Sequence, residues 1–292
     1  MAIKLDWKDL SLKGYTGVNI YRNAGKFDMS QALPAPLVAN LAANTVTYTD
    51  TTAAKNTSYS YLIAGVKDGK VTGGVPFTAG NYNDTGPGPT TLARGDWFCG
   101  YFGEVTSADL FTTGDIKTQI TATAGMTLNT IRTWYKFIYN GKIIFTPGIS
   151  IGTVSWFAVY AAGLIYGTDD NGNVPPAANP NPTPKNQMAR MTKGGWSFIF
   201  RAPKGVAAAI NSQVALWANT EVMEIFDRMY LNNPGTYGKG RFLDLPVVAG
   251  IYTNNWFANN VVAIMAPPSG LTSNVPTTAF NNWVPVLELE FL

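Results

Sequence analysis

The dipeptide Asn140-Gly141 lies between two runs of apolar and aromatic residues, WYKFIY and KIIF. Both central residues of a type I′ turn need positive φ, which Asn and Gly adopt most readily, so this dipeptide is the strongest short-range signal of a β-hairpin. Pro147-Gly148 ends the second run. We therefore expect two antiparallel strands joined at this turn, and we expect the chain to be organised around them.

A short helix is expected after this hairpin. Ser155 is a suitable N-cap for residues 156–162, WFAVYAA, and Gly163 follows as the residue that ends the helix in a left-handed conformation. The polar residues 168–186, with five prolines, then predict an exposed loop. This part of the sequence predicts architecture and carries no obvious chemistry.

The composition indicates a packed protein with few surface charges. Of 292 residues, 46% are hydrophobic, so a core is expected and disorder is not. Only 13% are charged, about half the usual globular share. The formal net charge is +3 and no run of like charges occurs, which argues against a nucleic-acid surface.

Histidine is absent and Cys99 is the only cysteine. The commonest general base and metal ligand are therefore missing, and neither a disulfide nor a thiolate metal site is expected within the chain. We predict no catalytic residues, no metal site and no cofactor, and we expect Cys99 to be a small buried apolar residue. The first residues, MAIKLDWKDL, contain no apolar run typical of a signal peptide, and no stretch is long enough to span a membrane.

The N-terminal part alternates short β-runs with turns. Strands are expected at residues 3–7, 18–22, 46–50, 58–66 and 70–72. Short strands at this spacing predict an all-β sandwich.

The residues of this part resemble a fibronectin type III domain. The resemblance rests on an early Trp, an IYR strand, a TYTDTT strand and the segment NTSYSYLIAGVKDGK. It implies that Trp7 packs across the core against Tyr59 or Tyr61. The first strand of that family has no counterpart here, so the resemblance implies a sandwich whose edge is open or is completed by a neighbour. Such modules are usually spacers or attachment domains.

A Gly/Pro-rich segment separates the two expected domains. Residues 83–94 include DTGPGP, which continues neither a strand nor a helix because Pro removes a donor and Gly loses too much entropy. We place an all-β fibronectin type III or immunoglobulin-like sandwich at 1–82 and a compact, loop-rich α+β domain at 95–292.

Several elements are expected within the second domain. Residues 107–110 and 113–117 predict capped starts of short helices. Residues 195–201 predict a strand and residues 214–230 a helix, with Val222, Ile225 and Phe226 buried and Glu221 and Glu224 solvated. Residues 231–282 are expected to be rich in loops, and the residues after Pro285 predict a final strand.

The segments of the second domain resemble a family of tailed-bacteriophage virion proteins. The matching parts, in order, are GPGPTTLARGDWFCGYFGEV, WYKFIYNGKIIFTP, VSWFAVYAAGLIYGTDDNG, GGWSFIFRAPKG, a helix ending DRMY, and WVPVLELEF. The GTDDNG loop and the terminal W-x-PVLEL are its specific parts. The resemblance implies a structural protein of the tail or another appendage, located in the virion after synthesis in the host cytoplasm.

The same hairpin, tryptophans and terminal strand are also similar to C-type-lectin-like and formylglycine-generating-enzyme-like domains. That similarity implies a compact α+β fold with long surface loops. The chain lacks the disulfides and calcium ligands of the lectins and the cysteine pair of the enzymes. The calcium-binding and catalytic functions of those families therefore do not carry over.

Two groups of residues are candidates for surface function. Asp169, Asp170, Asn171 and Asn173 form a polar loop that resembles the start of a calcium site. Pro180 occupies the position where such a site needs a bidentate Glu, so an Asx-rich turn is the better interpretation. The second group comprises the aromatic residues of polar loops, which suit recognition of a sugar or a protein: Tyr237, Tyr252, Trp256 and Phe257.

Carboxylates at Asp169, Asp170, Glu221, Glu224 and Asp227 offer an acid/base pair for a glycosidase, but a solvated helix face explains the glutamates better. Four tryptophans are expected in the core, namely Trp7, Trp134, Trp156 and Trp283.

These features together predict a bacteriophage virion structural protein. The first hypothesis is an appendage of the tail, collar or baseplate that displays a host-surface-binding domain. The second is capsid decoration or tail sheathing without a receptor role, and an enzyme acting on glycans is a distant third. The expected partners are other virion proteins through the N-terminal module, further copies of the chain, and a host surface glycan or protein. Nucleic-acid binding and membrane insertion are not expected.

Overall fold

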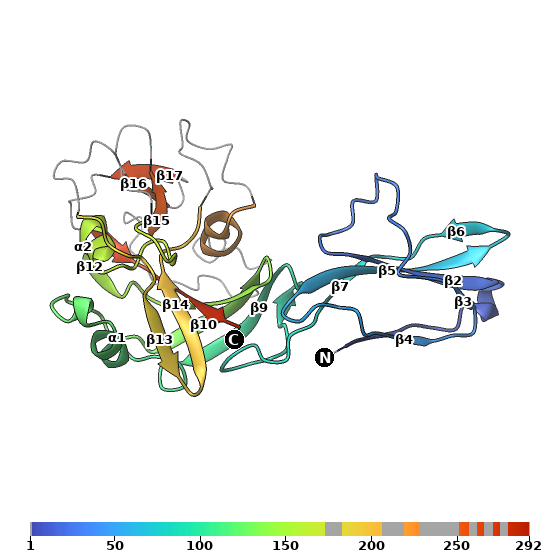
Figure 1. Cartoon of the computed structure of the whole chain (residues 1–292), viewed down its shortest axis with the longest axis horizontal. Helices are drawn as coiled ribbons and strands as arrows, with labels where there is room; N and C mark the ends of the chain where they lie inside the picture. The colour runs from blue at the N-terminus through green and yellow to red at the C-terminus, as the bar shows by residue number, and fades with distance from the viewer. Residues whose placement is uncertain are drawn as a thin grey trace. The chain divides into compact units, whose positions relative to one another are not determined.

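The computed structural model describes residues 2–172, 183–205, 219–227, 251–256, 262–265, 271–274 and 280–291. Within these residues the protein is mostly β-sheet with few helices (Figure 1). The chain divides into two compact units. Unit 1 contains Met1–Thr85, Asp96–Gly100 and Ile138–Gly141, and unit 2 contains Gly86–Gly95, Tyr101–Phe137 and Lys142–Leu292.

Unit 1 contains two β-sheets. In the first, β1 (Ile3–Asp6) pairs antiparallel with β4 (Thr47–Asp50). The second has the order β3-β2-β5-β6, and β7 also pairs with β5. Its strands are β2 (Gly17–Asn23), β3 (Val38–Ala42), β5 (Ser58–Lys67), β6 (Lys70–Thr72) and β7 (Phe77–Gly80).

Side chains from both sheets of unit 1 meet in one core. Ile3 and Leu5 alternate with exposed residues along β1, as a half-buried strand requires, and pack with Ile20, Tyr59 and Tyr61. Trp7, expected in the core, is only partly buried and packs against this cluster. The five strands expected in this part are present, whereas β3 and β7 were not expected. The residues of β3, VANLA, have little intrinsic preference for a strand, and β3 forms by pairing with β2.

The segment expected as a linker is partly buried. In unit 1, the backbone N–H of Asn81 donates to the carbonyl of Thr57 (2.9 Å), and the Tyr82 ring stacks on Trp97 with centroids 5.4 Å apart. In unit 2, the buried ammonium of Lys136 donates to the carbonyls of Gly86 (3.2 Å) and Pro89 (2.7 Å). Asn81 and Tyr82 are therefore part of the packing of unit 1, and Gly86 and Pro89 of the expected linker are part of the packing of unit 2.

A seven-stranded sheet dominates unit 2, in the order β13-β14-β19-β11-β10-β9-β8. Its strands are β8 (Arg94–Gly95), β9 (Cys99–Thr106), β10 (Thr133–Tyr139), β11 (Lys142–Pro147), β13 (Arg190–Lys193), β14 (Trp196–Arg201) and β19 (Val286–Glu290). The last strand of the chain pairs antiparallel with β14 on one side and with β11 on the other. Segments far apart in the sequence therefore form the middle of the sheet.

The predicted hairpin is confirmed in β10 and β11. Asn140 has φ 45° and Gly141 has φ 80°, so both central positions have the positive φ of a type I′ turn. Trp134 of β10 is fully buried, and its indole N–H donates to the carbonyl of Phe111 (2.8 Å). Trp156 and Trp283 are also fully buried.

A second sheet of unit 2 has the order β12-β18-β15-β16-β17. Its strands are β12 (Gly152–Val154), β15 (Ile251–Trp256), β16 (Val262–Met265), β17 (Leu271–Asn274) and β18 (Phe280–Trp283). Residues 231–282 are expected to be rich in loops, and the described part of that region forms the strands β15, β16, β17 and most of β18. β15, β17 and β18 carry Asn, a residue typical of turns, and β18 pairs with the distant strand β12.

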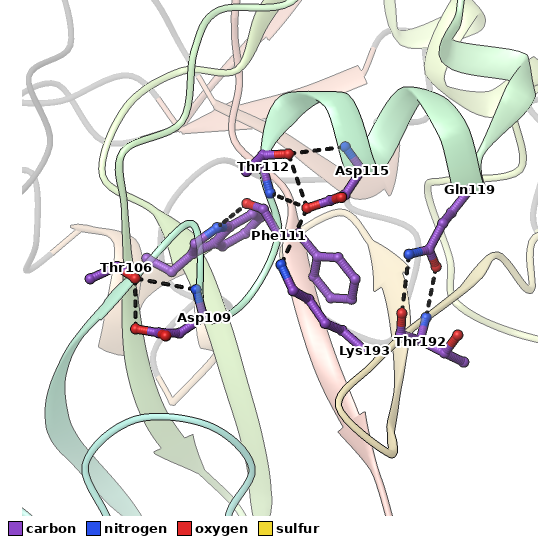
Figure 2. Close-up of polar contacts among 9 residues, drawn as sticks. Thr106, Asp109, Phe111, Thr112, Asp115, Gln119, Thr192 and Lys193 are labelled. Carbon is purple, nitrogen blue, oxygen red and sulfur yellow. Dashed lines mark hydrogen bonds and ion pairs between the residues drawn. The ribbon is translucent and has the colours of Figure 1, made fainter.

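The helix α1 (Thr113–Gln119) begins with a capping box at Thr112. The Thr112 hydroxyl accepts from the backbone N–H of Asp115 (3.1 Å), and the Asp115 carboxylate accepts from the backbone N–H of Thr112 (2.8 Å). Figure 2 shows how two further contacts hold α1 on β13: Lys193 reaches Asp115 (3.4 Å), and the Gln119 side chain bonds both backbone groups of Thr192. The other helix start, expected at residues 107–110, is a turn. In it the Thr106 hydroxyl donates to the Asp109 carboxylate and accepts from the backbone N–H of Asp109.

The helix α2 (Trp156–Ala161) has the predicted cap, because the Ser155 hydroxyl accepts from the backbone N–H of Ala158 (3.2 Å). Gly163 follows it with φ 77°. The long helix expected at 214–230 is represented in the described residues by one π-helical segment, η3 (Val222–Asp227). Two single 3-10 turns complete the described elements, η1 (Ser11–Lys13) and η2 (Thr121–Thr123).

Candidate functional site

The two aspartates of the predicted polar loop accept hydrogen bonds from residues of the same loop. An oxygen of Asp170 accepts from the Thr168 hydroxyl (2.6 Å) and from the backbone N–H of Gly172 (2.8 Å). These bonds lower the pKa of Asp170. An oxygen of Asp169 accepts from the side-chain amide of Asn186 (2.9 Å). Asp170 therefore forms an Asx-type turn, and Asn173 lies outside the described residues.

The residues on either side of positions 173–182 are tied to α2. The Tyr160 hydroxyl donates to the carbonyl of Asn171 (2.8 Å) and accepts from the backbone N–H of Lys185 (3.3 Å). The buried side chain of Gln187 donates to the carbonyl of Tyr160 (3.0 Å) and accepts from the backbone N–H of Ile165 (3.0 Å). Tyr160 itself stacks on Trp156. These hydrogen bonds hold the GTDDNG segment, residues 167–172, against α2.

The predicted aromatic recognition residues are only partly placed. Tyr252 and Trp256 lie in the strand β15, and Tyr237 and Phe257 lie outside the described residues. The register of β15 against β16 is irregular between Tyr252 and Trp256. The four residues therefore do not form a described site.

A buried ionic cluster that the sequence did not predict lies at the end of β14. Arg201 is 1% exposed, and its two terminal nitrogens each donate to one oxygen of Glu221 at 2.7 Å. Its Nε donates to Glu288 of β19 (2.9 Å). Lys204 and Lys142 also contact Glu288, at 3.3 Å and 3.0 Å. Three positive and two negative side chains thus leave one net positive charge.

Burial and charge act in opposite directions on the pKa values of this cluster. Burial raises the pKa of Glu288, but Arg201, Lys204 and Lys142 outweigh it and lower the value to about 2. Burial lowers the pKa of Arg201, and the two carboxylates raise it above its usual value. Burial and the neighbouring Arg201 lower the pKa of Lys204. Glu288 and Arg201 therefore stay charged at neutral pH.

This cluster corrects the expectation for Glu221. The predicted solvated position is buried, because Glu221 directly precedes η3 and pairs with Arg201 rather than with solvent. Glu224 is partly buried, and the side chain of Asp227 is not among the described parts. Glu221 and Glu288 are both engaged by Arg201, so this geometry ties the start of η3 to β14 and β19.

One sequence signal could have suggested the cluster. Arg201 ends the otherwise apolar run FIF, and Glu288 alternates with leucines in the terminal strand. A charge in a largely apolar strand needs a partner of opposite sign. The signal does not say which of the carboxylates supplies it, because Glu221 and Glu288 lie 20 and 87 positions away from Arg201.

Among the described residues, no three His, Cys, Asp or Glu side chains come together as a metal site would need. No helix of the described part is long and apolar enough to cross a membrane. No protein-family model, curated protein or solved structure matches the chain.

The largest exposed apolar side chains of the described residues all belong to unit 1. Three of them lie close together in the chain at the edge formed by β6 and β7, namely Val71, Val75 and Phe77. Val75 is 86% exposed, and Phe77 packs against the ring of Tyr61. We call these three residues the β6–β7 edge. Val71 lies opposite Val66 and Phe77 opposite Tyr61, positions on opposite faces of β5, so the exposed Val75 between β6 and β7 is the part open to contact with another protein.

Proposed function

We propose that this chain is a structural protein of a tailed-bacteriophage virion, and that it belongs to an appendage of the tail, collar or baseplate. Unit 1 attaches the chain to the particle and unit 2 is displayed toward the host surface. The proposal rests on the motifs of residues 86–292 that resemble phage virion proteins, and on the β6–β7 edge.

We further propose finer folds for the two units. The pairing β1-β4 and the order β3-β2-β5-β6 suit a fibronectin type III sandwich that lacks its first strand. Unit 2, with its hairpin and its terminal strand β19, is proposed as a C-type-lectin-like or formylglycine-generating-enzyme-like domain without the chemistry of either family.

The observation that carries the attachment role is the exposure of the β6–β7 edge. β5 pairs with β2 on one side and with β6 and β7 on the other. Gly74 lies against β5 so closely that a Cβ there would meet the carbonyl of Ile63, and the next residue, Val75, points into solvent. Burial of such a side chain against another virion protein would be favourable by about 1.5–3 kcal/mol.

Incorporation into particles tests this attachment surface. The full chain with Val75→Asp is expected to fold but to be missing from purified particles, because a charge there opposes apolar burial. Leu12→Asp is the matched control, since Leu12 is 85% exposed and belongs to η1 rather than to the β6–β7 edge. Equal incorporation of both variants would contradict attachment through the β6–β7 edge.

The position of the chain on the particle tests the appendage itself. Antibody-gold labelling of intact particles is expected at the tail, collar or baseplate. Label over the head would favour capsid decoration instead, and a chain absent from purified particles would end the proposal.

The receptor role of unit 2 has a separate test. Full-length protein is expected to bind host cells and to block phage adsorption. If adsorption is unaffected by saturating protein, unit 2 has a role within the particle. Release of fragments from host polysaccharide would identify a glycan-degrading enzyme.

A further inference from the structure

We propose that β1 is a self-complementary edge, through which two copies of this chain pair antiparallel about a two-fold axis at Leu5. The pairing would join the two-stranded sheets of two copies into one sheet of four strands, in the order β4-β1-β1-β4. The inference concerns the chain itself and holds whether or not the chain belongs to a virion.

The backbone of β1 offers hydrogen-bonding groups on its outer edge. In the described residues, β1 pairs with β4 alone. The N–H of Trp7 donates to the carbonyl of Val46 (2.9 Å), so Trp7 directs its backbone groups toward β4. Successive residues of an antiparallel strand direct these groups to opposite sides. Ile3 and Leu5 therefore face β4, whereas Lys4 and Asp6 direct their N–H and C=O groups away from it.

The side chains select a second copy as the occupant of this edge. Lys4 and Asp6 are both exposed on one face of β1 and lie 3.0 Å apart as an ion pair. A two-fold axis at Leu5 places Lys4 opposite Asp6 of the second copy, and Asp6 opposite its Lys4. Both cross-strand pairs then join opposite charges, which is the favourable arrangement for directly opposed residues.

The other face of β1 also fits this register. Leu5 would lie opposite Leu5 of the second copy, and Ile3 opposite its Trp7. Ile3 and Leu5 belong to the core of unit 1 and Trp7 packs at its margin, so the apolar layer would continue across the axis. Trp7 is only partly buried in one copy and would gain cover.

Neighbouring two-fold registers are worse. A two-fold axis at Lys4 would place the lysines of the two copies opposite each other. An axis at Asp6 would do the same with the two aspartates. Like charges directly opposite each other are destabilising. A charged edge also resists pairing with an unrelated apolar strand, which is how many proteins protect their edges. The same two charges therefore reject other strands and match a second copy of themselves.

The test uses the full chain and three charge variants in sedimentation velocity. The wild-type chain is expected to form a concentration-dependent dimer with a dissociation constant below about 1 mM. In a dimer of the Lys4→Asp variant, two acidic side chains would lie opposite each other at both charged positions. In a dimer of the Asp6→Lys variant, two lysines would do so. Each variant alone is expected to weaken the dimer at least tenfold. Lys70→Asp, on exposed β6, is the control and should dimerise as the wild type does.

Mixing the two variants gives the decisive result. Lys4→Asp and Asp6→Lys each fail to pair with themselves, yet together they restore opposite charges at every position, so an equimolar mixture should form heterodimers. Circular dichroism establishes that both variants are folded. A monomeric wild type, unchanged dimerisation of both variants, or a mixture that stays monomeric would each overturn the proposal. Amides of Lys4 and Asp6 that are protected from exchange in a monomer would show another segment on this edge, and would overturn it too.

Discussion

Arg201 is the residue whose replacement is expected to have the largest effect. It pairs with both Glu221 and Glu288 in a buried position, so Arg201→Met would remove the main partner of each carboxylate. Removing one member of a buried ion pair typically costs about 3–5 kcal/mol of unfolding free energy. Urea denaturation of the variant and of the wild-type chain measures this difference.

Arg190 provides the matched control. It lies on the adjacent strand β13 and pairs with Glu290 of β19, but its side chain is half exposed. Arg190→Met is expected to cost less than about 1 kcal/mol because solvent already screens the pair. Similar losses for the two arginine variants would mean that the Arg201 cluster is not an energetic unit.

Glu288 makes the stability of unit 2 dependent on acid pH. Its pKa is lowered from the ordinary 4.5 to about 2, so the folded state favours the charged carboxylate. The resulting stabilisation is complete above pH 4.5 and is lost as the pH falls to about 2, and it amounts to about 3 kcal/mol. Comparison of urea unfolding from pH 5 to pH 2 isolates it: Glu288→Gln should lose less stability over this range than the wild-type chain. Parallel pH curves would contradict the role of Glu288.

At the scale of elements, the capping box of α1 gives a prediction. Thr112→Ala removes the hydroxyl that accepts from the backbone N–H of Asp115, and loss of an N-cap costs about 1 kcal/mol. Thr118→Ala, at an exposed position inside the same helix, should be neutral or slightly stabilising because Ala is the better helix former. Thermal unfolding of the two variants provides the comparison, and equal melting temperatures would show that the cap is not needed.

The elements also show where local sequence signals suffice. The hairpin turn at Asn140-Gly141 and the start of α2 at Ser155 were predicted correctly, because φ preference and capping act within a few residues. The strands β15 to β18 were missed because β15, β17 and β18 carry Asn, which is typical of turns, and because β18 pairs with β12 and β15, which lie well before it in the chain. The expected helix at 107–110 failed for a related reason, since Thr106 and Asp109 can cap a turn as well as a helix.

At the scale of the whole molecule, unit 1 is completed by residues that follow the expected linker. Trp97 stacks on Tyr82, and its backbone N–H donates to the Thr78 hydroxyl (3.1 Å). Asp96 accepts from the backbone N–H groups of Phe98 and Cys99 and pairs with Lys26. A cut at residues 83–94 would therefore remove part of unit 1.

Trp97→Ala in the full chain tests this division. Loss of the stacked ring should weaken unit 1 by about 1 kcal/mol or more, because an aromatic pair contributes roughly that much beyond its buried area. Native-state hydrogen exchange should then show faster exchange in β5 and β7 and unchanged exchange in β14 and β19. Uniform acceleration in both units, or no change in unit 1, would argue against Trp97 as part of unit 1.

The sequence by itself determined the features whose causes are local: the type I′ turn, the capped α2, the alternating β1 and the β-rich character of the chain. The tertiary structure decided which distant residues meet. Glu221 is buried, although its helical pattern predicts a solvent-exposed position, because it pairs with the buried Arg201 at the end of β14. The tertiary structure also assigned Asp96–Gly100 and Ile138–Gly141 to unit 1. Periodicity and capping describe the few residues around a position, whereas the partner of a buried charge such as Arg201 lies 87 positions away at Glu288 and is chosen only when the sheet assembles.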